Sequence, residues 1–323
     1  MTIPTLDVHL SPEDAGAALR GDVQAGLTAS EKWLAPKYFY DARGSELFEQ
    51  ITELPEYYPT RTERGMLRAH AADIAAASGA DTLVELGSGS SEKTRLLLDA
   101  LRNAGTLRRY VPQDVSQSAL EAAATQVAAE YPEIQVHGVV GDFTTGLHEL
   151  PGGDHRMVAF LGGTLGNLIP AERAEFLAAV RQVLTAGEHL LLGAGLVTAP
   201  DVVVPAYDDA AGVTAEFNRN VLHVLNRELG ADFEVEAFEH RALWNEREEW
   251  IEMRLRAIKE MTVHIPELDL EVHFDAGEEI RTEISAKFRV DALGTELAAG
   301  GFELTRSWCD DEQRFTLLLA AAA

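Results

Sequence analysis

Cysteine is almost absent from this chain: Cys309 is the only one among 323 residues. A single thiol excludes an internal disulfide and any metal site built from several cysteines. The ten histidines include no pair spaced like the two ligands of a metalloprotease helix, so we expect no metal. This cysteine usage fits a reducing compartment, and we expect a cytoplasmic protein.

Basic residues are also scarce, with 27 lysines and arginines against 53 acidic residues and a formal net charge of -26. Such a surface repels phosphate backbones and anionic lipids, so we expect neither nucleic acid nor a membrane as a partner. Residues 1–10 lack the basic and apolar regions of a signal peptide. No stretch approaches the ~20 apolar residues that a membrane helix needs.

From residue 82 onward, short apolar runs alternate with helix-like segments, which is typical of βαβ units and a parallel sheet. The expected strands are 82–86, 109–112, 134–140, 157–161 and 189–192. The expected helices between them are 92–103, 117–130 and 171–184. A helix at 290–299 and an antiparallel hairpin of strands 302–307 and 315–319 complete the sheet. The pattern predicts an α/β, Rossmann-like fold.

Two segments fall outside this alternation. Residues 1–59 contain a capped helix at 11–25 and an aromatic-rich stretch at 33–58. A further helix is expected at 60–75, with Thr60 and Glu63 in capping-box spacing. Residues 197–287 are helix-like to about 229 and then alternate as strands 240–243, 250–258, 261–265 and 268–274. We therefore expect a cofactor-binding domain of residues 60–196 and 287–323, and a smaller α+β substrate-binding domain of residues 1–59 and 197–286.

The loop after the first expected parallel strand contains Gly87 and Gly89, which let the backbone approach a ligand closely. A nicotinamide enzyme requires a small residue where Glu92 stands, because the pyrophosphate lies at the amino terminus of the following helix. Glu92 puts an anion there instead. The loop therefore favours a ligand without phosphates, such as the sulfonium nucleoside S-adenosylmethionine.

Acidic residues end the next two strands of the expected sheet. Asp114 is placed where a carboxylate can accept hydrogen bonds from both ribose hydroxyls. Asp142 can bind the adenine amino group beside the ring of Phe143. Either carboxylate alone is typical of a turn or cap, but their placement after successive strands favours a nucleoside site.

Four longer motifs are shared with a known family. They are Leu54–Glu63 (LPEYYPTRTE), Glu85–Thr94 (ELGSGSSEKT), Phe160–Asn167 (FLGGTLGN) and Tyr207–Asn220 (YDDAAGVTAEFNRN). With them the chain resembles, over nearly its whole length, the histidine Nα-methyltransferases of ergothioneine biosynthesis. The resemblance implies a class I fold and transfer of three methyl groups from S-adenosylmethionine to the α-nitrogen of L-histidine, giving hercynine. It also implies a monomeric enzyme without a metal.

The resemblance also implies which residues form the site. Those that would hold S-adenosylmethionine are Gly87, Lys93, Asp114, Asp142 and Phe143. Those that would bind histidine are Tyr57, Asn167, Tyr207, Met253, Glu283 and Ser285. Asn167 and Tyr207 would bind the α-carboxylate and amino end, and Glu283 and Ser285 the imidazole nitrogens. Tyr40 would lie near the amine as the catalytic residue. Taken alone, the alternation of Glu283, Ser285 and Lys287 indicates an exposed strand face.

Three alternatives remain open from the sequence. The nearest is a methyltransferase of the same fold that acts on another amino acid or small amine, because Glu283 and Ser285 come from one strand that a modest rearrangement could refit. The others are a nicotinamide-dependent oxidoreductase, which Glu92 disfavours, and a binding module that kept the fold without activity.

Overall fold

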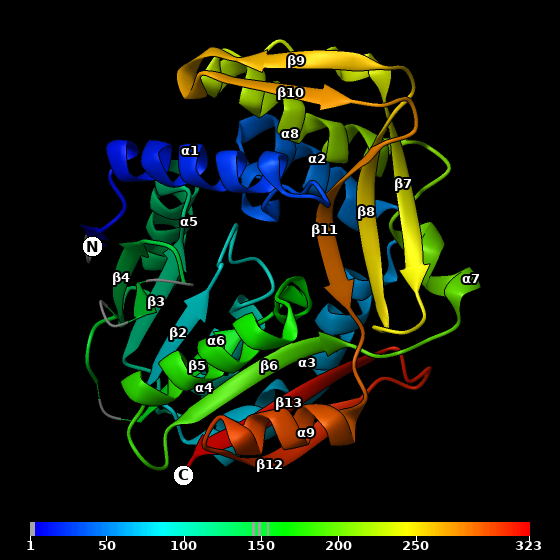
Figure 1. Ribbon diagram of the computed structural model, residues 1–323. Helices are drawn as coiled ribbons and strands as arrows, with labels where there is room; N and C mark the ends of the chain where they lie inside the picture. The colour runs from blue at the N-terminus through cyan, green and yellow to red at the C-terminus, as the bar shows by residue number, and fades with distance from the viewer. Residues whose placement is uncertain (1–3, 144–145, 148–149, 154) are drawn as a thin grey trace. The chain divides into compact units, whose positions relative to one another are not determined.

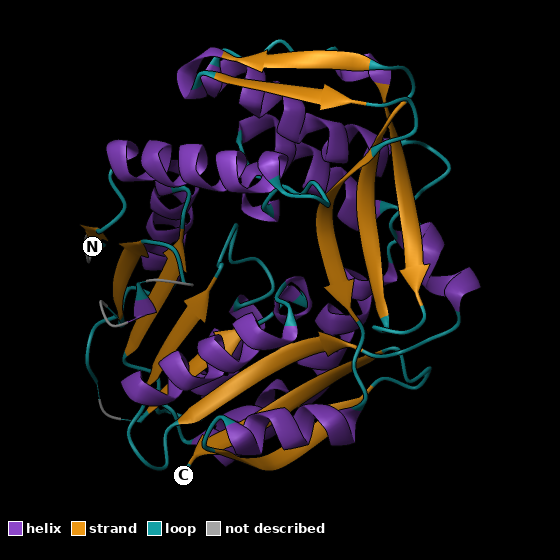
Figure 2. Ribbon diagram, in the orientation of Figure 1, coloured by secondary structure: helices purple, strands orange, loops and turns teal. Residues whose placement is uncertain are grey.

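The computed structural model describes residues 4–143, 146–147, 150–153 and 155–323. The chain forms two compact units. The first unit comprises Met1–Ser11, Pro59–Val197 and Phe288–Ala323, and the second comprises Pro12–Tyr58 and Thr198–Lys287. Figure 2 distinguishes their helices and strands.

The first unit is built on one eight-stranded sheet with the strand order β1-β4-β3-β2-β5-β6-β13-β12. Its strands are β1 (Thr5–Val8), β2 (Thr82–Leu86), β3 (Arg109–Asp114), β4 (Gln135–Val140), β5 (Arg156–Phe160), β6 (His189–Gly195), β12 (Phe302–Cys309) and β13 (Phe315–Ala322). The strands from β1 to β6 are parallel, whereas β13 pairs antiparallel with both β6 and β12. This topology confirms the predicted Rossmann-like fold and its terminal hairpin.

Helices cover both faces of this sheet (Figure 1). They are α3 (Tyr58–Ser78), α4 (Arg95–Asn103), α5 (Gln117–Glu130), α6 (Pro170–Val183) and α9 (Val290–Ala299). On one face, buried side chains of α3, α4 and α5 pack against alternate strand residues such as Leu83 and Met157. Toward α6, the Phe160 ring lies 4.6 Å from the ring of Phe176. Because both faces are covered, the sequences of the central strands are nearly continuous runs of apolar residues.

The chain order of the strands reverses beside β2. From β2 the chain proceeds to β3 and β4 on one side, and then to β5 and β6 on the other. Open α/β sheets bind ligands at such a switch point, in the crevice beyond the carboxyl ends of the strands. The loops that follow β2, β3, β4 and β5 are therefore the expected ligand-binding loops.

The second unit packs helices against a three-stranded antiparallel sheet. Its helices are α1 (Pro12–Thr28), α2 (Ala42–Glu53), α7 (Pro200–Val203) and α8 (Val213–Leu229), with 3-10 turns at Pro36–Phe39, Val204–Ala206, Val235–Ala237 and Pro266–Leu268. Its sheet has the order β11-β8-β7, from β7 (Phe238–Asn245), β8 (Trp250–Ala257) and β11 (Glu279–Ala286). A separate hairpin pairs β9 (Met261–Ile265) with β10 (Leu270–Phe274). One apolar core joins α1, α2, α8 and these strands.

Three expectations about local structure were wrong. Residues 1–11 belong to the first unit, because β1 pairs with β4; β1 is four residues long and mostly exposed, so it lacks an apolar signal. Helix α4 begins at Arg95, three residues after Glu92, which lies in the preceding turn and forms an ion pair with Arg64. Glu92 therefore does not lie at the amino terminus of α4, where it was expected to disfavour a dinucleotide.

The third wrong expectation is the capping box of Thr60 and Glu63. Helix α3 already begins at Tyr58, so Thr60 lies inside its first turn rather than at its cap. The side chain of Glu63 is buried and binds Lys93 and the main chain of Gly162 instead. A tertiary contact has taken the place of the local hydrogen bond that the spacing predicted.

A buried ion pair joins the amino-terminal ends of β5 and β6. The Glu188 carboxylate accepts two hydrogen bonds from the Arg156 guanidinium, at 2.8 and 2.9 Å, and others from the main-chain nitrogens of Arg156 and Thr185. Burial alone would raise the pKa of Glu188, but these hydrogen bonds lower it to about 2. This pair therefore contributes stability above the ordinary pKa of 4.5, and the contribution is lost as the pH falls from there toward 2.

We predict that Glu188→Ala destabilises the protein by about 3–5 kcal/mol, because it leaves the Arg156 charge buried without its partner. Urea unfolding at pH 7 measures this, with Glu175→Ala on the exposed face of α6 as the matched control. The pair would not have the stated role if both variants unfolded at the wild-type urea concentration.

Candidate functional site

The glycine loop after β2 has a backbone that favours glycine at two positions. Gly87 and Gly89 have φ angles of 66° and 49°, and a Cβ atom at either would meet no protein atom within 4 Å. The loop is attached to the end of β3, because Gly89 N donates to Asp114 Oδ2 at 2.9 Å. Asp114 Oδ1 accepts from Ser116 N. The predicted Gly87 and Asp114 thus lie on one connected pair of loops bordering open space.

Buried polar atoms beside this loop have no protein partner. The Ser88 hydroxyl and both side-chain polar atoms of Gln113 are buried and form no hydrogen bond within the part of the chain that the structure describes. Such atoms carry a desolvation cost unless a ligand or water satisfies them. Their position, beyond β2 and at the end of β3, favours a polar ligand at the switch point.

A buried carboxylate holds Lys93 in place. Glu63 Oε2 accepts from Lys93 Nζ at 2.6 Å, and Glu63 Oε1 accepts from Gly162 N at 2.7 Å. A Cβ atom at position 193 of β6 would lie only 2.1 Å from Glu63 Oε1, so this arrangement requires Gly193. The loops after β2 and β5 are therefore joined through one side chain of α3.

A second buried carboxylate lies beneath the glycine loop. Glu85 accepts hydrogen bonds from the hydroxyls of Thr94 and Tyr110, and Tyr110 also contacts Ser91 Oγ at 2.8 Å. Burial raises the pKa of Glu85 to about 7, although both hydroxyl bonds oppose the shift. This network links both ends of the loop to β3 and fixes its shape.

The other expected residues of the first unit follow β4 and β5. Gly141 N donates to Asp114 O at 3.1 Å, which brings the start of the Asp142 loop beside Asp114. The Phe143 ring packs edge-on against Phe160, 5.0 Å away. Asn167 ends the 3-10 turn Thr164–Asn167, shortly after the Gly162 that binds Glu63. The structure thus brings the cofactor residues of the sequence prediction to one edge of the sheet.

In the second unit, three polar side chains form a closed cluster. The Tyr207 hydroxyl and Ser285 Oγ are 2.8 Å apart, and Lys287 Nζ donates to Tyr207 at 2.8 Å and to Ser285 at 2.7 Å. All three side chains are buried. The exposed face indicated by the alternation of Glu283, Ser285 and Lys287 is therefore wrong for Ser285 and Lys287, while Glu283 is partly buried. Burial and the charge of Glu283 raise the pKa of Tyr207 well above its ordinary value, which keeps the hydroxyl protonated.

Glu283 and Met253 are direct cross-strand partners on β11 and β8. Directly opposed residues of an antiparallel pair point to the same face. The register shifts between Arg281 and Glu283, at a bulge that contains Thr282. A bulge re-aims the side chains beside it, and here it determines the face on which Glu283 lies.

The aromatic residues expected at the site occupy one aromatic cluster. Tyr57 packs edge-on against Tyr207 and Phe48, with centroid distances of 6.2 Å. Tyr40 packs edge-on against Phe48 and Phe217 and is 41% exposed. The Tyr40 side chain is therefore held by neighbouring rings while part of it stays accessible.

A neutral histidine supports the backbone at Tyr207. His240 Nε2 lies 2.8 Å from Tyr207 O, and His240 Nδ1 lies 2.8 Å from Asn218 Nδ2. Because a carbonyl accepts and an amide nitrogen donates, His240 carries its proton on Nε2. Burial lowers the pKa of His240, in agreement with a neutral ring.

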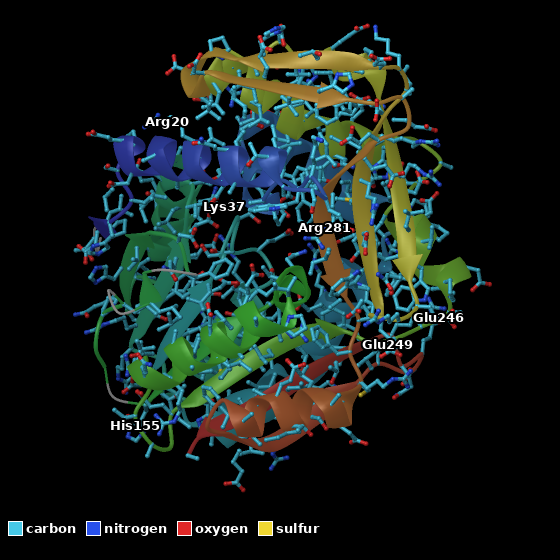
Figure 3. The ribbon with its side chains drawn as sticks, viewed as in Figure 1. Arg20, Lys37, His155, Glu246, Glu249 and Arg281 are labelled. Atoms are coloured by element: carbon cyan, nitrogen blue, oxygen red, sulfur yellow. The ribbon has the colours of Figure 1, made fainter. Side chains whose placement is uncertain are left out.

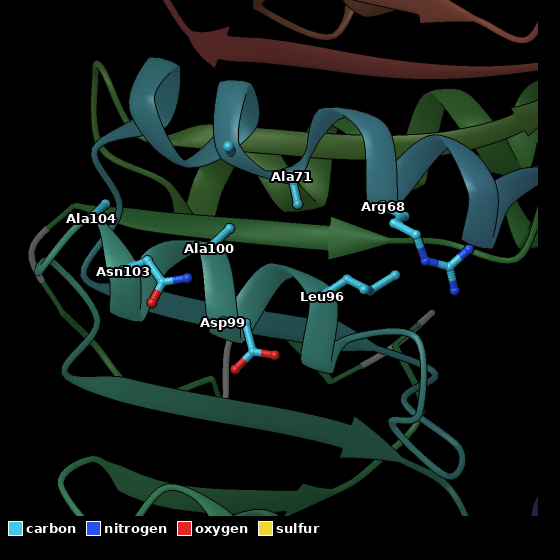
Figure 4. A pocket seen from close by; sticks show the side chains of 8 residues that line it. Arg68, Ala71, Leu96, Asp99, Ala100, Asn103 and Ala104 are labelled. Atoms are coloured by element: carbon cyan, nitrogen blue, oxygen red, sulfur yellow. The ribbon is translucent and has the colours of Figure 1, made fainter.

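Other features of the described residues do not compete with these sites. No group of three or more His, Cys, Asp or Glu side chains among them could hold a metal ion. Within the same residues, no helix has both the length and the apolar character to cross a membrane. A shallow pocket between α3 and α4 is lined by Arg68, Leu96, Asp99, Asn103 and alanines (Figure 4), and it contains none of the expected site residues.

The family described as "Histidine-specific methyltransferase, SAM-dependent" matches residues 19–322 of the chain. The protein belongs to this family. The methyltransferase is 57% identical over 314 residues to a histidine N-alpha-methyltransferase of Mycobacterium tuberculosis, with 97% of this chain and 98% of that protein covered. It is 56% identical to that of Mycolicibacterium smegmatis, with 97% of both chains covered.

One solved structure is more distant in sequence from this methyltransferase. An S-adenosylmethionine-dependent methyltransferase from Clostridium acetobutylicum aligns with a TM-score of 0.49 and 10% identity, over 86% of this chain and 98% of that one.

The first unit of the methyltransferase fits the S-adenosylmethionine of its family. The open space at Gly87 and Gly89, the unsatisfied Ser88 and Gln113, and the ammonium of Lys93 suit a polar ligand that carries a carboxylate. Sequence reasoning missed Glu63 and Lys287. The capping-box spacing predicts a local helix cap for Glu63, and the alternation along the strand predicts an exposed side chain for Lys287.

We predict that Gly193→Ala weakens binding of S-adenosylhomocysteine about 10-fold or more, because the added methyl group displaces Glu63 and releases Lys93 from its charge-assisted hydrogen bond. Calorimetry measures the affinity, and Gly65→Ala on α3, where a Cβ meets nothing within 4 Å, is the control. Wild-type affinity in a folded Gly193→Ala protein would contradict the role of Glu63.

Proposed function

We propose that this protein transfers three methyl groups, one at a time, from S-adenosylmethionine to the α-amino group of L-histidine, giving hercynine for ergothioneine biosynthesis. The family match over residues 19–322 is the observation that carries the proposal. The full-length similarity to two histidine N-alpha-methyltransferases supports the same substrate.

The experiment is turnover of methyl-labelled S-adenosylmethionine with a panel of amino acids and small amines, followed by mass spectrometry of the products. The proposal predicts that histidine is consumed far faster than the other acceptors and accumulates as the trimethylated form. Preference for another amino acid would favour the same-fold alternative, and absence of transfer would leave only ligand binding.

We assign the binding of the methyl donor to residues of the first unit. Gly87, Lys93, Asp114, Asp142 and Phe143 of the first unit bind the methyl donor. The bound donor supplies an electrophilic methyl group on a sulfonium. Because that displacement dissipates charge, the protein chiefly has to align the reactants and exclude water.

We assign histidine recognition to the residues that the family resemblance implies. Tyr57, Tyr207, Met253, Glu283 and Ser285 belong to the second unit, whereas Asn167 belongs to the first. We assign Glu283 and Ser285 to the imidazole nitrogens, and Tyr207 with Asn167 to the carboxylate and amino end. Met253, opposite Glu283 in the β8–β11 pair, lines the ring pocket.

We predict that Glu283→Ala weakens histidine binding about 10- to 100-fold, because a charged hydrogen bond to an imidazole N–H is lost. Binding of S-adenosylhomocysteine is expected to change little. Calorimetry with both ligands decides this, with Glu267→Ala in the exposed turn before β10 as the control. Equal losses for the two ligands would refute the assignment.

The amine must be unprotonated when it attacks, although its free pKa lies above neutrality. We assign to Tyr40 the acceptance of a hydrogen bond from this amine, with water as the final proton acceptor. The partial exposure of Tyr40 supports the assignment, because the proton needs a path to solvent.

We predict that Tyr40→Phe lowers kcat about 10-fold or more while binding of S-adenosylhomocysteine is retained, because the amine loses the group that orients it. Rates for each of the three methylations are measured by quenched mass spectrometry. An unchanged kcat for all three steps would remove Tyr40 from the mechanism.

The remaining expectations are also part of the proposal. A cytoplasmic, monomeric enzyme is supported by the single cysteine and the net charge of -26, which also disfavours nucleic acid and anionic membranes as partners. Light scattering at several protein concentrations tests the oligomeric state.

A further inference from the structure

The buried ammonium of Lys287 has no role in the site assigned so far. It lies directly after β11, and its main-chain nitrogen donates to the carbonyl of Glu249 in the turn between β7 and β8 (Figure 3). Its side chain is only 7% exposed and contacts two of the proposed histidine-binding residues, Tyr207 and Ser285. Burying a lysine is costly, so the position of this charge requires a compensating interaction.

The hydrogen atoms of the cluster can be counted. An ammonium group only donates, so the oxygens of Tyr207 and Ser285 both accept from Lys287. One hydroxyl proton lies in the bond between Tyr207 and Ser285. One hydroxyl proton and one ammonium hydrogen are not used in these three bonds. The cluster therefore offers donors and a positive charge.

The ligand chemistry that matches the Lys287 ammonium and the Tyr207 hydroxyl is an anionic acceptor. A carboxylate accepts two or more hydrogen bonds and carries the opposite charge, whereas an imidazole nitrogen accepts only one and is neutral. Glu283, which affects the pKa values of both Tyr207 and Lys287, supplies the negative charge for the imidazole N–H. Glu283 in β11 and Lys287 directly after β11 thus carry opposite charges, which match the imidazole N–H and the α-carboxylate of histidine.

We propose that Lys287 is a specificity-determining residue, which acts through the hydroxyl of Tyr207 to select substrates that carry an α-carboxylate, whereas Ser285 keeps its assignment to an imidazole nitrogen. The proposal rests on the proposed histidine specificity and deepens it. It explains why a lysine is buried among hydroxyl groups rather than exposed on the strand.

The charge of Lys287 depends on pH in a range that can be reached. Burial lowers the pKa of Lys287 to about 8, while Tyr58 and Glu283 oppose the shift. The hydroxyl of Tyr207 faces the same ammonium and stays protonated. Lys287 is therefore mainly charged at pH 7 and mainly neutral above pH 9. The preference for a carboxylate should decrease between these two pH values.

Two ligands that differ by one carboxylate test the proposal: imidazolepropionate and ethylimidazole. Neither has an α-amine, so neither can be methylated there, and the result does not depend on turnover. Binding is measured by calorimetry on the full chain saturated with S-adenosylhomocysteine. We expect the wild type to bind imidazolepropionate about 10- to 100-fold more tightly than ethylimidazole at pH 7.

Lys287→Met and Lys287→Gln are expected to abolish this preference while the affinity for ethylimidazole changes little. Lys259→Met, at an exposed lysine of the same unit, is the matched control and should keep the preference. In a double-mutant cycle with Tyr207→Phe, Lys287→Met should have little further effect on the preference for imidazolepropionate.

A wild-type pH titration provides an independent test if the Lys287 variants do not fold. The preference should decline with a midpoint near pH 8. A preference that is constant from pH 7 to 9.5, or variants that weaken both ligands equally, would overturn the proposal. Neither result would bear on the proposed function, which depends on whether the wild type methylates histidine.

Discussion

The buried carboxylate of Glu63 joins three parts of the first unit that are far apart in the sequence. Glu63 lies on α3. Its carboxylate binds Lys93 at the end of the glycine loop and the main chain of Gly162 in the turn after β5. A buried carboxylate requires hydrogen-bond donors. If either loop moved alone, Glu63 would stay buried but lose one of its donors, which is costly, so the two loops are held together. Gly193 completes the arrangement, because any larger residue would occupy the same space. The loops that we assign to the methyl donor are thus shaped before a ligand binds.

The second unit applies the same constraint to the opposite charge. Lys287 is buried against Tyr207 and Ser285, and His240 of β7 holds the backbone of Tyr207. Hydrogen bonds between buried polar groups fix side-chain directions more precisely than apolar packing does. An amino acid has one anionic and one cationic end together with its side chain, so a binding site for it needs charges of both signs at defined places. Glu283 and Lys287 provide these two charges on one strand and the residue after it.

Much of the fold could be predicted because its signals are local. The apolar run of β2 and the helices α5 and α9 have the bounds expected from sequence, and the positions of Asp114 and Asp142 follow from the strands they end. Besides the misplaced starts of α3 and α4, the failures involve partners distant in the chain. Strand β1 is defined by its pairing with β4, Glu63 binds a loop 30 residues away, and the bulge beside Glu283 exists only in register with β8. Alternation alone could not reveal that Lys287 is covered, because burial depends on the residues packed around it.

The central claim is that the donor and the amino acid are recognised by separate sets of residues, chiefly in the first and second units respectively. Hydrogen exchange with each ligand added alone measures this most directly. S-adenosylhomocysteine should protect main-chain amides of residues 87–94 and 114–116, where the loop amides already contact Asp114, and histidine should protect residues 250–257 and 279–287. Protection of the glycine loop by histidine alone, with β8 and β11 unchanged, would contradict the account.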